Sequence, residues 1–173
     1  MIRRLFPFTI AVIVVVLDRI TKWLIRTQVS AWDNIVVIPN FFSIVHAENR
    51  GAAFGLLSEA TGAWRNFLLI GLSLAVLVFI GAILWKPRRP PFARDWILRA
   101  GLGLVLGGAL GNVYDRIVSG TVTDFLEFYL GDHQFPSFNV ADSAITTGAG
   151  LLLLDMWRSR ERKPSAAGEH QKV

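Results

Sequence analysis

Cysteine is absent from the sequence, and only three histidines occur among its 173 residues. Without cysteine the protein has no thiol nucleophile, no cysteine-ligated metal and no disulfide. The histidines, His46, His133 and His170, do not form an HExxH motif or another spaced metal-binding pattern. We therefore expect a protein that uses no metal and no other cofactor.

Charged residues are few, and they are clustered rather than dispersed. Hydrophobic residues make up 53% of the chain and the mean hydropathy is +0.45, which excludes an ordinary soluble domain. A helix needs about 20 apolar residues to cross a bilayer. Four segments have this length: about Leu5–Ile25, Phe67–Trp85, Trp96–Val118 and Val140–Trp157. The predicted fold class is an all-α polytopic membrane protein, with four transmembrane helices in residues 1–157 and a disordered cytoplasmic tail, 158–173.

The basic residues predict the orientation. Twelve of the 18 lysines and arginines lie at the N-terminus, within Lys86–Arg99 or after Trp157, whereas Ile117–Val140 contains none. By the positive-inside rule, both termini and the middle loop face the cytoplasm. The first and last loops then face outward. The net charge of +5 reflects this topology and contact with anionic membrane lipid, not nucleic-acid binding.

The first outward loop carries strand signals. In Asn34–His46 two runs of β-branched and aromatic residues flank Pro39-Asn40, which predicts a small β hairpin or twisted sheet between the first two helices. Its apolar content suits contact with the membrane surface or with an extended peptide. In the following Glu48–Gly55, small residues allow close backbone approach and Asn49 is able to bond a main chain. A tight turn with an Asn cap explains the same residues.

Three helical segments, the first, the third and the fourth, contain polar residues with both a structural and a functional interpretation. Asp18 and Lys22 share one face of the first segment, as a structural ion pair or as part of a site. In the third segment Gly103, Gly107 and Gly111 have the small-xxx-small spacing of closely packed helices.

Farther along that third segment, Asn112 and Arg116 continue a polar face that either packs or orients a substrate carbonyl or a catalytic carboxylate. In the fourth segment Asn139 and Asp142 have the spacing of a helix cap, with the carboxylate in the first turn. That cap accounts for Asp142 but leaves Asp124 without a partner.

Asp124 and Asp142 bracket the last loop, each near the end of an apolar segment. Carboxylates at a membrane boundary are unfavourable and indicate function. Two converging carboxyls are able to hydrolyse a peptide, because an ionised one takes a proton from water while a protonated one polarises the scissile carbonyl. The helix N-terminus favours Asp142 as the base and Asp124 as the acid.

Other functions fit these residues less well. A Ser–Lys dyad would need Lys22 with Ser137 or Ser143, and neither serine lies in a nucleophile elbow. A proton-coupled membrane transporter or a non-catalytic membrane adaptor using the acidic residues is the alternative. The acids lie at one edge of the predicted helices, however, rather than at the midplane where transporters bind their substrates.

Five short blocks occur in order along the chain. They are Asp18-x-x-Thr21-Lys22, Asn49-x-Gly51-Ala52-Ala53-Phe54, Gly107-Gly108-Ala109-x-Gly111-Asn112-x-x-Asp115-Arg116, Val122-x-Asp124-Phe125 and Phe138-Asn139-x-Ala141-Asp142. Together with four predicted membrane helices, this pattern resembles lipoprotein signal peptidase (signal peptidase II), a family of bacterial inner-membrane aspartyl proteases.

The resemblance implies an enzyme and a substrate. Asp124 and Asp142 would form the catalytic dyad of an aspartyl endopeptidase near the extracytoplasmic face. The supporting residues would be Asn49, Gly51, Asn112, Arg116, Asn139, Asp18 and Lys22. The substrate would be a prolipoprotein whose cysteine carries diacylglycerol, cut on the N-terminal side of that cysteine. Membrane lipid is the other expected partner; no metal, nucleic acid or oligomer is required.

Overall fold

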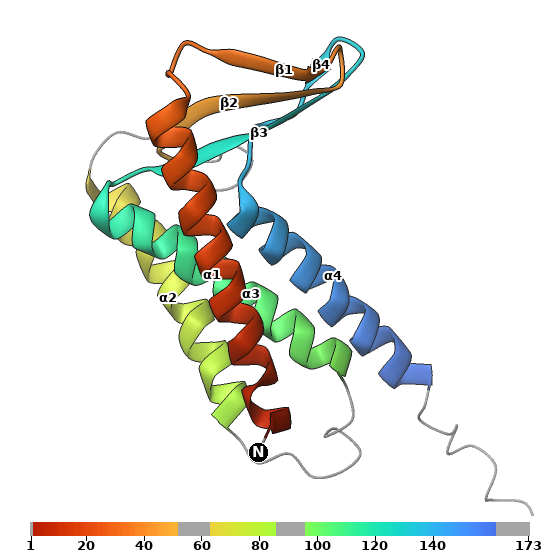
Figure 1. Cartoon of the computed structure of the whole chain (residues 1–173). Helices are drawn as coiled ribbons and strands as arrows, with labels where there is room; N and C mark the ends of the chain where they lie inside the picture. Colours follow the sequence, from red (N-terminus) through yellow and green to blue (C-terminus); the bar gives the residue numbers. More distant parts are fainter. Residues whose placement is uncertain (1, 52–62, 86–95, 162–173) are drawn as a thin grey trace, which may run out of the picture.

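The computed structural model describes residues 2–51, 63–85 and 96–161, in which four helices carry a small antiparallel sheet at one end (Figure 1). The helices are α1 (Ile2–Gln28), α2 (Ala63–Trp85), α3 (Trp96–Val118) and α4 (Val140–Glu161). The strands are β1 (Asn34–Ile38), β2 (Phe42–Asn49), β3 (Val122–Leu130) and β4 (His133–Gln134).

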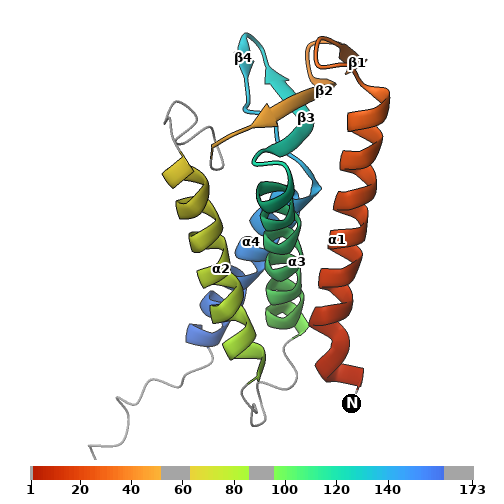
Figure 2. The ribbon, with the colours of Figure 1, turned by 90° about the vertical axis from the view of Figure 1, so that its left-hand side faces the viewer.

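Helix α3 is the central helix, and its glycines allow the neighbouring helices to approach it closely (Figure 2). A Cβ at Gly107 would lie 2.7 Å from the Ala11 carbonyl oxygen of α1. One at Gly101 would lie 3.0 Å from the Gly148 carbonyl oxygen of α4. The predicted close packing of this glycine-rich helix is confirmed, and the glycines serve two different faces of α3. Helix α2 packs on α3 through an apolar cluster that includes Ile80 and Leu102.

The sheet has the order β1-β2-β3-β4, so the loop after α1 and the loop after α3 build it together. The β1–β2 pair matches the strand signals of Asn34–His46, and Asn40 makes its turn with a φ of 58°. Strands β3 and β4 were not predicted, although β3 (Val-Thr-Asp-Phe-Leu-Glu-Phe-Tyr-Leu) is rich in β-branched and aromatic residues. The sheet is therefore larger than the predicted hairpin.

The register of β2 and β3 positions the start of β3. Ala47 pairs with Asp124, Glu48 with Thr123 and Asn49 with Val122, after a register shift between Ile44 and Ala47. Paired residues lie on the same face of a sheet. Beyond β4, the Phe138 carbonyl accepts hydrogen bonds from the amides of Phe125 and Leu126, which fixes the chain next to β3 as it enters α4.

Four predicted helix boundaries need correction. Helix α1 begins at Ile2 rather than near Leu5, and α2 begins at Ala63 rather than near Phe67. Helix α1 continues to Gln28 rather than ending near Ile25, and α4 continues through Glu161 rather than ending at Trp157. The first residues of the predicted disordered tail are thus helical, because the polar C-terminal turn of α4 extends the apolar run without a helix-breaking residue. The remainder of that tail, 162–173, and most of Gly51–Gly55 lie outside the described residues.

In the described part of the chain, two helical segments are long and apolar enough to cross a membrane, Trp64–Trp85 and Trp96–Val118, with mean hydropathies of 2.9 and 1.4. Helices α1 and α4 do not meet this criterion. Their hydropathy is lowered by charged residues such as Asp18, Lys22 and Asp142.

Candidate active site

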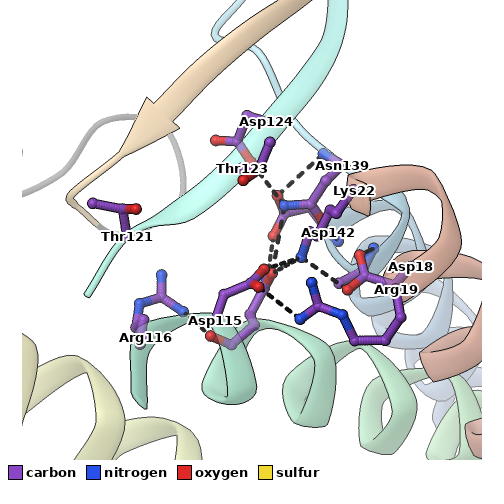
Figure 3. Close-up of polar contacts among 12 residues, drawn as sticks. Asp18, Arg19, Lys22, Asp115, Arg116, Thr121, Thr123, Asp124, Asn139 and Asp142 are labelled. Atoms are coloured by element: carbon purple, nitrogen blue, oxygen red, sulfur yellow. Dashed lines mark hydrogen bonds and ion pairs between the residues drawn. The ribbon is translucent and has the colours of Figure 1, made fainter. Parts of the chain in front are cut away.

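Asp124 and Asp142 reach the same cavity from different elements. Asp124 lies near the start of β3, and Asp142 lies in the first turn of α4. Both line a cavity of about 380 Å³, together with Asn49 at the end of β2. Asp124 is buried, whereas Asp142 is half-buried. The tertiary structure therefore brings these two aspartates into one site, although most of β3 and all of β4 lie between them in the sequence (Figure 3).

Each oxygen of the Asp124 carboxylate accepts a hydrogen bond from an asparagine. Asn49 Nδ2 donates to Oδ2 at 2.9 Å, and Asn139 Nδ2 donates to Oδ1 at 2.7 Å. The Asn49 Oδ1 accepts from the amide of Gly51 (2.8 Å), and the Asn139 Oδ1 accepts from the amide of Asp142 (2.9 Å). Because only the amide oxygen accepts and only the amide nitrogen donates, these bonds fix which end of each side chain faces Asp124.

Asn112 holds Asp142 in the same manner. Its Nδ2 donates to Asp142 Oδ1 at 2.7 Å, while its Oδ1 accepts from the buried Lys22 Nζ at 3.0 Å. The Asn139 amide lies 3.4 Å from Asp142 Oδ2, so Asn139 and Asp142 also form the reciprocal cap at the start of α4. The helix cap and the candidate site are thus not alternative explanations of Asn139 and Asp142, because the same two side chains cap α4 and belong to the site.

The environment of Asp124 favours its protonated form. Burial and the neighbouring charge of Asp142 raise the pKa of Asp124 to about 7, against the opposing effects of the Asn49 and Asn139 hydrogen bonds and the Lys22 charge. A carboxyl group with such a pKa exchanges a proton near neutral pH, as a general acid or base does.

A buried group of charged side chains joins α1 to α3 behind the two aspartates (Figure 3). Asp115 forms ion pairs with Arg19 at 2.6 Å, with Lys22 at 2.7 Å and with Arg26 at 3.1 Å. Lys22 also pairs with Asp18 at 2.9 Å, and the side chains of Asp18, Lys22 and Asp115 are fully buried. Charges that are buried in this way remain stable only when they are paired.

This group connects to the start of α4. Asp18 Oδ1 accepts a hydrogen bond from the Ala141 amide at 3.1 Å, so a residue of α1 satisfies a free amide of the first turn of α4. Asp18 and Lys22 form the ion pair that the structural interpretation of the sequence expects, and their supporting role at the site stays a prediction. Arg19 and Arg26 were not among the predicted site residues, although their spacing from Lys22 puts all three on one face of α1.

Arg116 contacts main-chain carbonyls rather than an aspartate. Its Nη2 donates to the Gly51 carbonyl at 3.1 Å, and its Nη1 lies 3.4 Å from the carbonyl of Asn112. Gly51 contributes both its amide, to Asn49, and its carbonyl, to Arg116. Arg116 thereby ties the segment after β2 to α3, which keeps Asn49 against Asp124.

Glu48 lies next to Asn49 and locks β2 onto β3, and it was not among the predicted site residues. It accepts from the hydroxyls of Thr121 at 2.5 Å and Thr123 at 2.9 Å, and lies 3.2 Å from His46 Nε2. Burial raises the pKa of Glu48, but these hydrogen bonds and the Arg26 charge outweigh it and hold the pKa below its usual value. Glu48 therefore stays ionised and secures the strand pair that carries Asn49 and Asp124.

The family model described as signal peptidase (SPase) II matches residues 10–158, which is most of the chain and includes both aspartates. The chain belongs to the signal peptidase II family. This family consists of proteases, so the protein is a peptidase. The transporter or adaptor alternative is not favoured by this finding.

Several relatives resemble the chain over nearly its whole length. It is 49% identical to the lipoprotein signal peptidase of Solibacter usitatus (strain Ellin6076) over 155 residues, which cover 90% of this chain and 92% of the relative. It is 43% identical to that of Pseudomonas aeruginosa PAO1 over 160 residues, or 92% of each. Two solved bacterial membrane enzymes share the fold. The first has a TM-score of 0.79 and 30% identity, and the match covers 96% of this chain and 93% of that enzyme. The second has a TM-score of 0.73 and 32% identity, and the match covers 87% of this chain and 91% of that enzyme.

Proposed function

We propose that this membrane peptidase removes the signal peptide from diacylglyceryl-modified prolipoproteins, cutting on the N-terminal side of the lipidated cysteine. The observation that carries the proposal is the convergence of Asp124 and Asp142 on one cavity, each fixed by an asparagine amide. The names of the relatives, lipoprotein signal peptidases, supply the substrate class.

In this proposal Asp142 is the general base and Asp124 the general acid. Asp142 takes a proton from a water molecule as the water oxygen attacks the scissile carbonyl carbon, while Asp124 gives its proton to the carbonyl oxygen. The resulting gem-diol collapses when Asp142 returns its proton to the leaving nitrogen and Asp124 regains one from a diol hydroxyl. The C–N bond breaks, and both aspartates return to their starting states.

Two features support this assignment of roles. The raised pKa of Asp124, about 7, leaves a large fraction of this carboxyl group protonated at neutral pH. Asp142 lies in the first turn of α4, where the Asn139 amide lies 3.4 Å from its Oδ2 and the helix dipole favours a negative charge. The three asparagines donate to the carboxylates and cannot themselves exchange protons, so they hold the geometry without competing for the proton.

We propose that all four helices cross the membrane. On α1 a series of apolar side chains from Leu5 to Leu24 is exposed on the protein surface. At about 1.5 Å per residue this face is about 30 Å long, the thickness of a bilayer core. The charged residues of α1 that lower its hydropathy, Asp18 and Lys22, are fully buried against α3 and α4. An exposed apolar face of this extent fits lipid rather than water.

The tryptophans support the same placement. All six are exposed, and they lie in two groups at opposite ends of the helices. The group at the sheet end is Trp23, Trp32 and Trp64, and the group at the other end is Trp85, Trp96 and Trp157. Tryptophan is enriched at both interfaces of a membrane. With the termini cytoplasmic, the sheet and the two aspartates lie near the extracytoplasmic surface, and residues 1–157 act as one peptidase domain without need of an oligomer.

Replacement of each aspartate tests the proposal. Asn is nearly the size of Asp and keeps a polar side chain, but it cannot exchange a proton. We expect Asp124→Asn and Asp142→Asn each to lower cleavage of a purified diacylglyceryl-modified precursor by about 10³-fold or more. The double variant should be little worse than either single one, because the two groups act as a unit.

The matched control is Asp132→Asn, at an exposed position in the turn between β3 and β4. It should cleave at the wild-type rate. Substantial turnover by either dyad variant, with an unchanged thermal unfolding temperature, would exclude the aspartyl mechanism.

A further inference from the structure

The cavity that contains Asp124 and Asp142 does not end at the two carboxylates. It continues along α4, where Ser143, Ile145, Thr146 and Thr147 line it after Asp142. Since α4 runs away from the sheet, these residues lie on the bilayer side of the aspartates (Figure 1). At about 1.5 Å per residue, Thr146 and Thr147 lie about 6 and 7.5 Å along the helix from Asp142.

The hydroxyls of Thr146 and Thr147 differ from others in the helices. Hydroxyls in a helix usually bond the carbonyl four residues earlier. Five described hydroxyls do so at 2.8 to 3.2 Å: Thr9, Thr21, Thr27, Ser73 and Ser143. Within the described ranges, 2–51, 63–85 and 96–161, the side-chain hydroxyls of Thr146 and Thr147 make no hydrogen bond, and both residues are exposed. A hydroxyl that faces the apolar part of a membrane without a partner is unfavourable.

The charge of the cavity limits what such hydroxyls bind. Its charged lining residues are Asp124 and Asp142, and the described lining includes no lysine, arginine or histidine. A phosphate would therefore meet two carboxyl groups and no cation. A neutral acceptor, such as an ester carbonyl, suits the hydroxyls without this repulsion. The cavity volume of about 380 Å³ lies in the range of small-molecule sites, about 300 to 1,000 Å³.

We propose that Thr146 and Thr147 donate hydrogen bonds to the ester carbonyls of the diacylglyceryl group on the substrate cysteine, and so form the subsite that recognises this lipid. The inference rests on the proposed function. The ester carbonyls are several bonds from the scissile nitrogen, through the cysteine side chain and the glycerol. When extended, this linkage is long enough to reach one helical turn beyond Asp142 while the scissile bond lies between the aspartates.

The test compares a diester substrate with its diether analogue, which has the same alkyl chains but no carbonyl oxygens. The enzymes are wild type and a Thr146→Val/Thr147→Val double variant, in nanodiscs of one ester phospholipid. Valine keeps the shape of threonine and removes only the hydroxyl. We expect wild type to favour the diester by about tenfold in kcat/KM, mainly through KM, because two neutral hydrogen bonds are lost with the ether. The double variant should cleave both substrates at nearly the same rate.

Two variants make the test specific. Thr9→Val removes a hydroxyl that bonds the Leu5 carbonyl on α1, away from the cavity, and should keep the preference. Thr146→Ser retains a hydroxyl and should also keep the preference for the diester substrate. This variant covers the case in which the valine variant does not fold. Equal cleavage of both substrates by wild type, or an unchanged preference in a folded double variant, would overturn the inference.

The source of the ester is tested separately. Replacing the nanodisc phospholipid by its ether form, with the diester substrate kept, should leave the rates unchanged. A preference that follows the nanodisc lipid instead would mean that bulk lipid occupies the subsite, which overturns the assignment to the substrate. If wild type cleaved neither substrate, the proposed function itself would fail.

Discussion

At the scale of single residues, three asparagines set the chemistry of the site. Asn49 and Asn139 donate to Asp124, and Asn112 donates to Asp142. Each amide oxygen is held by another group, a main-chain amide or the Lys22 ammonium. An aspartate at any of these positions would have a similar shape but would add a negative charge next to the dyad, which explains why the amide suits the site.

The pKa of Asp124 predicts the pH dependence of cleavage. With a pKa of about 7, Asp124 carries its proton below neutral pH and loses it as the pH rises. If Asp124 is the general acid, kcat/KM should fall about tenfold per pH unit above about 7. The measurement is kcat/KM from pH 5 to pH 9 with thermal unfolding recorded at each pH. A flat profile up to pH 9 would show that this proton is not needed.

Asn139→Asp separates the role of Asn139 in the cap from its role in the dyad. Aspartate caps a helix as well as asparagine does, so the fold should survive. Its carboxylate would face Asp124, repel the negative charge and raise the pKa of Asp124 further. We expect about 10²-fold slower cleavage and a fall in rate that begins at higher pH. The control is Asn40→Asp at the exposed hairpin turn, and an unchanged pH profile for Asn139→Asp would contradict the assigned contact.

At the scale of the elements, α3 holds the site together because it packs on α1 and on α4. Gly111 of α3 lies where the three helices meet: a Cβ there would lie 2.6 Å from Asp18 Oδ2 of α1 and 3.4 Å from Ala141 Cβ of α4. Asn112 follows directly, so its reach to Lys22 and Asp142 depends on this close approach. A larger residue on this face would separate the partners of the dyad.

Gly107→Ala tests this packing with a single added methyl group. The new Cβ would lie 2.7 Å from the Ala11 carbonyl and 2.8 Å from Val14 Cβ, so α1 must shift. We expect a loss of about 1–3 kcal/mol in the free energy of unfolding, together with slower cleavage. Gly71→Ala on α2 is the matched control, because nothing lies within 4 Å of its Cβ and alanine favours a helix over glycine. Equal stabilities of the two variants would show that α1 does not pack here.

At the scale of the whole molecule, the sheet and the two aspartates lie at one end of the helices, and the C-terminal turn of α4 lies at the other (Figure 1). Both loops that build the sheet leave the helices at the same end, so the sheet holds Asn49 and Asp124 together at that end. Orientation in the membrane then decides from which side a substrate is cut.

The absence of native cysteine makes the orientation directly testable. Asp132→Cys lies in the exposed β3–β4 turn, and Ser159→Cys lies in the last turn of α4. In intact cells, a membrane-impermeant maleimide should label the first variant and should label the second only after lysis. This expectation follows from the unequal distribution of basic residues. The reverse labelling pattern would put the site on the cytoplasmic face.

The sequence by itself determined the features that depend on local composition and spacing. The lengths of apolar runs gave the four helices to within a few residues, and the glycine spacing in Gly103–Gly111 gave the close packing of α3. The ordered motifs named the family, and they predicted residues of a site. The catalytic roles of Asp124 and Asp142 stay a prediction that the variants above test.

Only the tertiary structure decided which groups meet. Three sets of contacts join segments far apart in the chain: the pairing of β2 with β3, the ion pairs of Asp115 with Arg19 and Arg26, and the contact of Glu48 with two threonines. The same is true of the raised pKa of Asp124, which follows from burial and from the approach of Asp142. Sequence periodicity reports the face on which a side chain lies, but a pKa or a hydrogen-bond partner depends on what the rest of the chain brings against that face.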